Sequence, residues 1–403
     1  MTGKPLRSPT QRYRIAMVAA CPFPTSQGSQ VLIRQLSETL HERGHELHLV
    51  TYHYGEPANE PMHFHIHRIL GFIPYRKLRA GPSFRKPLLD LLLAIELMRV
   101  VRRYRIQIIH AHNYEGLAVG ISVRSICGVR IVYHSHNAMI DELHTYFRSA
   151  AAQRVANRLA AVLDRNLPRT ADHCIALNNE LVEYFQRTGV RRERIGRLPP
   201  GTFVQEFQPP RLPESVRQQK SSQPTVIYTG NLDAYQNLEI LFAAMTIVSK
   251  HIPTARLLMV SHAAPGPVAR LVRSFDLADQ VRFITTNSFT EVVNLLADSD
   301  VAVIPRTNWS GFPIKLINYM AAGKAILASE GSAKHMVHLE NGYIVPNFNV
   351  PAMAHGLVQL LREPALRERL GAAAARTARE SHNWHILCSE LESIYSQVLS
   401  PRP

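Results

Sequence analysis

The chain has 403 residues, which is long for one hydrophobic core and favours two domains of roughly 150–200 residues each. Apolar residues make up 46% and charged residues 19%, a composition that is ordinary for a globular protein and excludes a low-complexity array. Lys and Arg outnumber Asp and Glu by 46 to 31, so the formal net charge of +15 predicts attraction to anions.

Strand-like and helical runs alternate through the first half of the chain. Val18-Ala-Ala-Cys21 resembles a lipoprotein cleavage box, but the apolar run before it is shorter than the ~7–15 residues of an export signal. The apolar run 14–20 is therefore predicted to be the first strand. Ile33, Leu36 and Leu40 share one face of a predicted helix that a glycine ends. Further strands are expected at 47–51, 107–111, 130–133, 174–177 and 194–198.

The second half repeats this alternation. Its strands, rich in Val, Ile and Leu and flanked by helices, predict parallel sheets that are covered on both faces. The expected class is therefore α/β, with two doubly wound Rossmann-like domains and a cleft between them. A stretch rich in Pro, Gln and Ser at 208–224 predicts a linker. The expected strands lie at 225–229, 256–260, 281–284, 301–304 and 325–328.

This pattern gives an N-terminal domain at 1–207, a C-terminal domain at 225–380, and a final helix at 381–403 that is expected to pack back on the first domain.

The apolar run 87–101 contains two acidic residues and is too short to span a bilayer. The cysteines are scattered without a CxxC pair, which predicts buried free thiols and a reducing compartment. They are Cys21, Cys127, Cys174 and Cys388.

The most informative segment lies between the strands at 301–304 and 325–328. It begins Ser310-Gly-Phe-Pro-Ile-Lys315 and ends at Gly323, so a glycine loop precedes a short helix with a glycine stop. This order places the positive end of a helix at the carboxyl edge of a sheet, where phosphates bind. Lys315 and Asn318, one turn apart, are expected to point toward the ligand; an ordinary crossover helix is the alternative.

Several motifs, in the expected order, resemble the GT-B-fold glycosyltransferases, in particular retaining family 4 (glycosyl transferases group 1). The resemblance covers nearly the whole chain. It implies a GT-B fold, a nucleotide-sugar donor, retention of anomeric configuration, and no obligatory metal or other cofactor. The motifs are the loop 22–29, the segment 36–49 with Gly44-His45, the histidine-bearing segments 109–113 and 132–137, Leu198-Pro-Pro-Gly-Thr202, Tyr228-Thr-Gly-Asn-Leu232, Asp300-Val-Ala-Val-Ile-Pro305, the segment 310–324 and Asn341-Gly-Tyr-Ile-Val-Pro346.

The donor motif departs from the family pattern. Ser310 and Asn318 occupy the places of two glutamates, and Lys315 replaces a proline. Asn231 and Gln236 stand where the family has an arginine and a lysine. Charged hydrogen bonds contribute ~1.5–3 kcal/mol and neutral ones ~0.5–1.5 kcal/mol, so losing two cations weakens a diphosphate site. The chain is either a divergent active enzyme with Lys315 as its phosphate cation, which the hydrogen-bonding replacements favour, or a degraded transferase.

Candidate site residues follow from the resemblance and from the residues that depart from its pattern. Lys315 and His136 are the expected catalytic residues, with His136 beside the transferred sugar, and His112 and Glu142 are expected to contact the acceptor. His110 and His112 are expected on opposite faces of their strand, and no metal site is expected because no ligand spacing supports one. Each position also has a structural alternative, such as a turn glycine or a histidine that satisfies loop carbonyls. The expected donor contacts are Gly28, Asn231, Gln236, Arg306, Ser310, Gly311, Phe312, Ile314 and Asn318.

The segment 68–105 combines many basic residues with a leucine-rich run. Further arginines at 148, 154, 158 and 165 add to the positive charge of this part of the chain. A basic and apolar segment suits a surface that rests on anionic lipid. The alternative is a core helix with a solvated basic face. The basic residues are Arg68, Arg76, Lys77, Arg79, Arg85, Lys86, Arg99, Arg102, Arg103 and Arg105.

The expected function is transfer of a sugar from a nucleotide-sugar to a hydroxyl of a lipid-linked or polysaccharide precursor, by a cytoplasmic enzyme peripheral on the inner face of the membrane. No Asp/Glu pair stands out as acid and nucleophile, which fits catalysis by placement and charge stabilisation. One alternative is a non-catalytic GT-B scaffold that binds nucleotide or glycan and regulates a partner. Nucleic-acid binding rests on net charge alone, so no such partner is expected.

Overall fold

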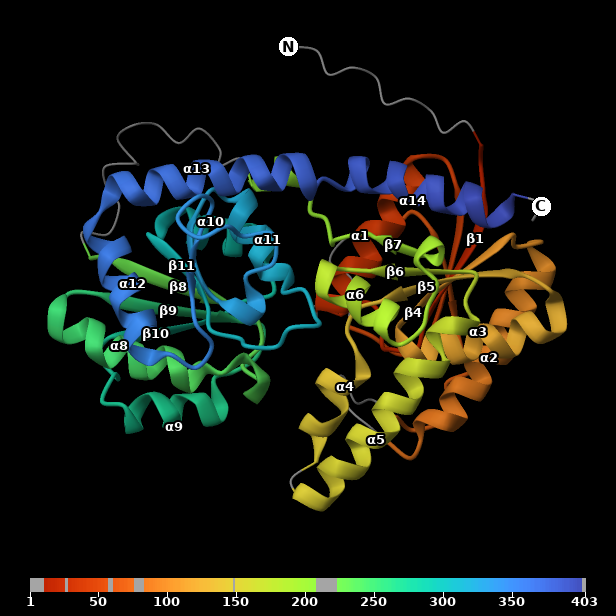
Figure 1. The fold of residues 1–403 in the computed structure, drawn as a ribbon, viewed down its shortest axis with the longest axis horizontal. Helices are drawn as coiled ribbons and strands as arrows, with labels where there is room; N and C mark the ends of the chain where they lie inside the picture. The colour runs from red at the N-terminus through yellow and green to blue at the C-terminus, as the bar shows by residue number, and fades with distance from the viewer. Residues whose placement is uncertain are drawn as a thin grey trace, which may run out of the picture. The chain divides into compact units, whose positions relative to one another are not determined.

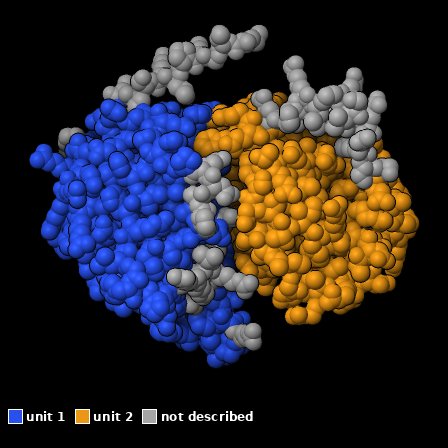
Figure 2. Space-filling model, turned by 180° about the vertical axis from the view of Figure 1, so that it is seen from behind, with its two compact units in different colours: residues 1–199, 384–403 blue, residues 200–383 orange. Residues whose placement is uncertain are grey.

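The computed structural model describes residues 11–25, 28–56, 61–75, 83–147, 149–207 and 223–400 (Figure 1). The chain forms two compact units, coloured separately in Figure 2. Unit 1 comprises 1–199 and 384–403, and unit 2 comprises 200–383. Most of the predicted linker, at 208–222, lies outside the described residues.

Unit 1 is built on a seven-stranded parallel sheet with the order β3-β2-β1-β4-β5-β6-β7. The order reverses between β1 and β4, and open α/β sheets bind ligands at the carboxyl ends of the strands beside such a point. The strands are β1 (Arg14–Ala19), β2 (Glu46–Thr51), β3 (His65–Arg68), β4 (Ile108–His112), β5 (Arg130–Ser135), β6 (His173–Ala176) and β7 (Ile195–Arg197).

The helices of unit 1 alternate with these strands, as the sequence predicts. The first one buries Leu32, Ile33, Leu36 and Leu40, and the predicted stop, Gly44, has φ +89°, a conformation that favours glycine. The helices are α1 (Gly28–Glu42), α2 (Lys86–Arg103), α3 (Asn113–Cys127), α4 (Met139–Glu142), α5 (Ala150–Asn166), α6 (Asn179–Arg187) and α14 (Trp384–Leu399).

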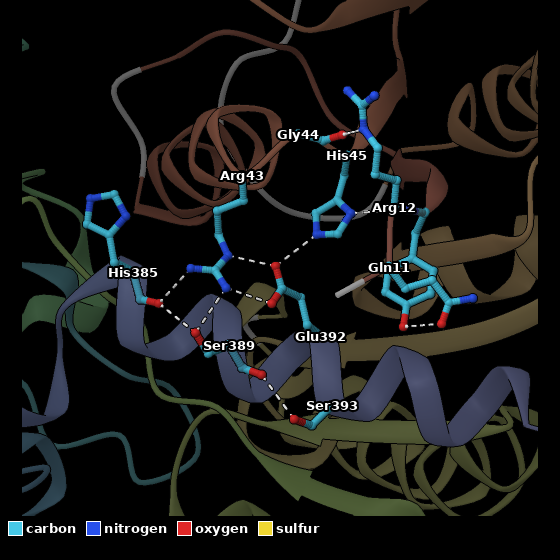
Figure 3. Close-up of polar contacts among 10 residues, drawn as sticks. Gln11, Arg12, Arg43, Gly44, His45, His385, Ser389, Glu392 and Ser393 are labelled. Carbon is cyan, nitrogen blue, oxygen red and sulfur yellow. Dashed lines mark hydrogen bonds and ion pairs between the residues drawn. The ribbon is translucent and has the colours of Figure 1, made fainter. Parts of the chain in front are cut away.

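Helix α14 is tied to the end of α1 by a charged contact inside unit 1 (Figure 3). The Arg43 guanidinium donates two hydrogen bonds of 2.6 Å to the Glu392 carboxylate, and Nε2 of His45 lies 2.9 Å from the same carboxylate. The indole N–H of Trp384 donates to Oε1 of Gln35 at 3.0 Å. Bidentate arginine–carboxylate pairs fix geometry as well as adding energy, so the final helix is a built part of this unit.

Unit 2 contains a six-stranded parallel sheet with the order β10-β9-β8-β11-β12-β13, which reverses between β8 and β11. Its strands are β8 (Thr225–Thr229), β9 (Arg256–Ser261), β10 (Val281–Thr285), β11 (Val301–Ile304), β12 (Ala325–Ser329) and β13 (Tyr343–Val345). Its helices are α8 (Leu238–His251), α9 (Gly266–Ser274), α10 (Phe289–Asp298), α11 (Ile314–Ala321), α12 (Val350–Arg362) and α13 (Pro364–Ser381).

The predicted α/β class with two doubly wound sheets is confirmed, and the structure adds two short edge strands that the sequence pattern did not indicate, β3 and β13. All cysteines are free thiols, as predicted, although Cys21 and Cys127 are only partly buried. Among the helices that the structure describes, none is long and apolar enough to cross a bilayer.

Candidate functional site

The predicted phosphate cation, Lys315, lies in the first turn of α11, which follows β11 at the switch point of the unit 2 sheet. Its ammonium nitrogen lies 3.8 Å from the centroid of the Tyr228 ring and 3.2 Å from Oε1 of Gln236. The ring face attracts the cation. Desolvation by burial, followed by repulsion from Arg306, lowers the pKa of Lys315 well below its usual value of 10.5.

Three residues of the predicted donor site form one hydrogen-bonded chain. The Lys315 ammonium donates to Gln236, whose Nε2 donates to Oδ1 of Asn231 at 2.8 Å. Nδ2 of Asn231 then donates to the hydroxyl of Tyr235 at 2.6 Å. The two neutral residues that replace the family's cations therefore orient Lys315 without neutralising its charge.

Gly230 leaves room for this ammonium. It follows β8 with φ +121°, and a Cβ atom built there would lie 3.0 Å from Nζ of Lys315. That separation is closer than ordinary side-chain contacts, so a residue larger than glycine displaces the lysine as well as straining the backbone.

A second cation lies close by. Cζ of Arg306 is 5.3 Å from the centroid of the Tyr235 ring, and its Nη2 is 2.5 Å from where a Cβ atom of Gly311 would lie. Nε of Arg306 is buried without a hydrogen-bond partner. Among the described residues, neither Arg306 nor Lys315 forms an ion pair with a carboxylate. Both residues are half-buried, and two neighbouring basic side chains without a carboxylate partner in the described ranges suit an anionic ligand.

The other predicted donor residues take different places in unit 2. Oδ1 of Asn318 accepts a long hydrogen bond of 3.4 Å from the hydroxyl of Thr202, so Asn318 contacts the Pro-Pro-Gly-Thr segment. The Phe312 side chain is buried, and Ser310 is buried as well. Ile314 is the first residue of α11 and is half-buried. The rings nearest to Phe312 belong to His335 and His382, with centroids at 5.7 Å and 5.5 Å.

Four histidines gather at the ends of β4 and β5 in unit 1. Nε2 of His136 lies 3.1 Å from Nδ1 of His112, and Nε2 of His110 lies 3.0 Å from Nδ1 of His134. The prediction that His110 and His112 lie on opposite faces is wrong: their ring centroids are 4.7 Å apart. Side chains alternate along a strand, so residues two positions apart share a face.

The predicted catalytic histidine, His136, is electrically neutral at physiological pH, because burial lowers its pKa to about 4. Its side chain is 7% exposed. A neutral imidazole donates through one nitrogen and accepts through the other, so His136 suits a hydrogen bond to a sugar hydroxyl and not the pairing of a phosphate charge.

The segment after His136 is held by Asp164, which the sequence analysis did not single out. Asp164 is fully buried and accepts hydrogen bonds from the backbone N–H groups of Met139 and Ile140, at 3.1 Å and 3.0 Å, in the first turn of α4. The hydroxyls of Tyr114 and Tyr184 donate to the same carboxylate. Its place on the buried stripe of α5, with Ala156 and Ala160, is the signal that identifies it.

Two further predicted residues lie in unit 1. The Glu142 carboxylate accepts from Nδ2 of Asn137 and from the hydroxyl of Tyr146, so it braces the segment around α4. Gly28 is exposed and is the first residue of α1. The predicted acceptor residue His112 is buried against His136.

Comparisons with known proteins agree with this architecture. Residues 26–206 match the family model Glycosyltransferase Family 4, and residues 213–377 match Glycosyl transferases group 1. Phosphatidyl-myo-inositol mannosyltransferase of Mycobacterium tuberculosis is 24% identical over 96% of this chain and 97% of its own length. D-inositol 3-phosphate glycosyltransferase of Corynebacterium diphtheriae is 22% identical over 96% and 95%.

Solved structures of similar fold cover both units. Sucrose-phosphate synthase from Thermosynechococcus elongatus has a TM-score of 0.81 at 21% identity, covering 96% of this chain and 99% of its own. HepE from Anabaena, in complex with UDP and glucose, has a TM-score of 0.75 at 16% identity, covering 96% and 100%. With one family model matching the N-terminal part of the chain and the other the C-terminal part, this chain belongs to the GT-B-fold glycosyltransferases of family 4, glycosyl transferases group 1.

Proposed function

We propose that this glycosyltransferase moves a sugar from a nucleotide-sugar to a hydroxyl acceptor and that Lys315 and Arg306 bind the diphosphate of the donor. The observation that carries the proposal is that both cations lie at one sheet switch point, oriented by neutral side chains and unpaired with any carboxylate in the described part of the chain. A nucleoside diphosphate supplies the missing negative charge.

The same two cations serve the reaction. Negative charge grows on the departing diphosphate as the glycosidic bond breaks, and cations fixed beforehand stabilise that charge without reorganising. The amide chain through Gln236 and Asn231 holds the Lys315 side chain in place before the donor arrives, and the bound diphosphate then favours its protonated form. Since the protein supplies the charge itself, we expect no obligatory metal ion.

His136 has a different role in the proposal. As a neutral imidazole it hydrogen-bonds a hydroxyl of the transferred sugar, which orients the sugar for transfer with retention of configuration. Asp164 supports this by fixing the segment that follows the histidine. Asp164 is therefore a positioning residue.

The proposed acceptor is a lipid-linked precursor at an anionic membrane surface, because unit 1 exposes two apolar stripes among basic residues. On α5, Val155, Leu159 and Val162 are 65%, 52% and 57% exposed. Arginines at 154, 158 and 165 are exposed on the same helix. On α2, the exposed residues are Leu88, Leu91 and Ile95, while Leu89, Leu93 and Leu97 on the other side are buried.

Two of the basic residues that the sequence assigned to the membrane surface form contacts within unit 1 instead. Lys86 forms an ion pair of 2.7 Å with Glu115, and Arg68 donates to the backbone carbonyl of Phe23 at 2.7 Å. Arg76, Lys77, Arg79 and Arg148 lie outside the described residues. The membrane proposal therefore rests on α5 and on the exposed side of α2, at the inner face of a cytoplasmic membrane.

A panel of nucleotide-sugars tests the proposal. The purified chain is incubated with each donor, alone and with a lipid-linked acceptor mixture, and release of the nucleoside diphosphate is measured. We expect release with one donor class, accelerated by acceptor, and a product that keeps the anomeric configuration of the donor. Tight nucleotide binding with no release under any condition supports the alternative, a non-catalytic GT-B scaffold.

A further inference from the structure

Four imidazole rings line one face of the unit 1 sheet, and they are almost fully buried. His110, His112, His134 and His136 are 0%, 1%, 1% and 7% exposed. Neighbouring ring centroids lie 4.7–5.3 Å apart around the cluster. The register of β4 against β5 places His112 directly opposite His134, and the two-residue period of each strand adds the other two.

The cluster contains nitrogen atoms that have no hydrogen-bond partner. They are Nε2 of His112, Nε2 of His134 and Nδ1 of His136, each out of contact with solvent. The contacts that do form join His110 to His134 and His112 to His136, while Nδ1 of His110 lies 2.6 Å from the Tyr395 hydroxyl on α14. Buried polar atoms are rarely left unsatisfied, and for Nε2 of His112 a bound ion is one of the standard explanations.

We propose that His110, His112 and His134 bind one divalent transition-metal cation of the zinc class. One ring nitrogen from each of these residues lies within 4.8 Å of the corresponding nitrogens of the other two. The separation of 3.0 Å between Nε2 of His110 and Nδ1 of His134 already suits two neighbouring ligands, because bonds of ~2.0–2.1 Å at angles of 90–109° put ligand nitrogens about 2.9–3.4 Å apart. Binding releases the proton that these two nitrogens share.

Two of the three proposed ligands, His110 and His112, have outer partners that support this assignment, whereas Nε2 of His134 has none among the described residues. Nδ1 of His110, the nitrogen that does not face His134, contacts the Tyr395 hydroxyl. Nδ1 of His112 contacts Nε2 of His136. A histidine that binds a metal normally uses its second nitrogen in such a hydrogen bond, which fixes the tautomer and the ring orientation. Tyr395 and His136 therefore serve as outer partners, and Nε2 of His112 remains as the ligand atom.

The ligand set selects the class of cation. Imidazole nitrogen suits Zn²⁺, Co²⁺, Ni²⁺ and Cu²⁺, whereas Mg²⁺ and Ca²⁺ prefer oxygen ligands. Three neutral histidines leave one position of a tetrahedral site to water or a small anion. The site lies in unit 1, so it is independent of the proposed diphosphate site in unit 2.

Cobalt(II) is the most direct probe. The full chain, without an affinity tag and treated with a chelator, is titrated with Co²⁺ at pH 7.5 and without nucleotide. We expect one equivalent to bind, with the absorption bands of tetrahedral nitrogen-ligated cobalt and displacement by Zn²⁺. Zinc should also raise the unfolding temperature. A sulfur-to-cobalt charge-transfer band points to Cys21 or Cys127 and overturns the proposal.

Two variants and one control complete the test. His134→Gln and His110→Gln should each weaken cobalt binding tenfold or more, and the second serves if the first does not fold. His65→Gln alters a different histidine group, formed with His48 on β2 and β3, and should bind cobalt like wild type. Wild type without cobalt bands, or folded His134→Gln and His110→Gln proteins that bind as tightly as wild type, overturn the assignment.

Discussion

The Lys315 ammonium lies 3.8 Å from the centre of the Tyr228 ring, and it is held there by a neutral amide oxygen instead of a carboxylate. An aromatic face and an amide stabilise a cation without cancelling its charge. The site therefore holds a side chain that can carry an uncancelled positive charge when an anion binds.

Replacing Lys315 by methionine should lower turnover tenfold or more while the fold survives. Methionine retains an unbranched apolar side chain against Tyr228 but loses the charge that contacts the diphosphate and the hydrogen bond to Gln236. Initial rates with the preferred nucleotide-sugar check this. Lys250→Met, an exposed change at the end of α8, is the matched control and should leave the rate unchanged.

Gly230→Ala should weaken nucleotide binding through displacement of Lys315. A Cβ atom at this position would lie 3.0 Å from Nζ. Gly266→Ala is the control, because that glycine also has a positive φ but has no atom within 4 Å of the added carbon. Both changes should cost about 1–3 kcal/mol of stability by backbone strain, measured by denaturant unfolding. Equal nucleotide affinity in the two variants would argue against the displacement.

Nucleotide binding should weaken as the pH rises. Burial and Arg306 lower the pKa of Lys315 in the free protein, and a bound diphosphate raises it again, so binding takes up a proton. Complexes that take up protons form more tightly at lower pH. Calorimetric titrations in buffers of different ionisation enthalpy measure the uptake directly. Lys315→Met should show a smaller uptake than wild type; the same uptake in both would assign the proton to another group.

The stability of Asp90→Asn relative to wild type should depend on pH. Burial raises the pKa of Asp90 to about 6, although the Tyr52 hydroxyl donates to its carboxylate at 2.6 Å. The pKa of Asp90 in the folded protein exceeds its ordinary value of 3.8, so folding favours the protonated acid. The contribution of the protonated acid to the free energy of unfolding is lost as the pH rises through about 6. At pH 7.5 the variant should therefore gain on the order of 2 kcal/mol, and the gain should disappear near pH 4. Urea unfolding across this range is the measurement.

Substituting serine for Val155, Leu159 and Val162 together should abolish flotation with anionic liposomes at low salt. These side chains form the exposed stripe of α5 between its arginines. Ile126→Ser on α3 removes a similarly exposed apolar side chain, 62% accessible, and should not alter flotation. Wild type that stays unbound to vesicles rich in anionic lipid would contradict the proposed membrane surface.

Local patterns predicted the parallel sheets well, because buried strands of Val, Ile and Leu are distinct from amphipathic helices. The strands Thr225–Thr229 and Val301–Ile304 have the predicted bounds. The edge strand His65–Arg68 escaped prediction because its sequence, His-Ile-His-Arg, lacks an apolar run. The helix stop at Gly323 was predictable from position alone, and its φ of +65° agrees.

The sequence singled out candidate donor-site residues but not the contacts between them. Its place in the first turn of a predicted helix singled out Lys315, and family position singled out Asn231 and Gln236. Nothing in the sequence shows that they form one hydrogen-bonded chain. Tyr228 lies within the buried strand β8, where an aromatic residue most often indicates core packing. Contacts between residues distant in sequence, such as Lys315 over Tyr228, depend on tertiary packing that a local pattern does not encode.

The histidine cluster shows a different limit. Four histidines in two H-x-H repeats were visible in the sequence, but assigning His110 and His112 to opposite faces concealed their convergence. The correct strand period places each pair on one face, and the register between β4 and β5 then brings the pairs together. That register is a tertiary property.

Calorimetric titration with nucleoside diphosphates tests the central claim most directly. Wild type, Lys315→Met, Arg306→Gln and Lys250→Met are each titrated with UDP, GDP and ADP at pH 7.5. We predict that wild type and Lys250→Met bind one of these nucleotides with equal affinity, while Lys315→Met and Arg306→Gln bind it at least tenfold more weakly. Unchanged affinity in both of the site variants, with their folds intact, would contradict the assignment of these two cations to the diphosphate.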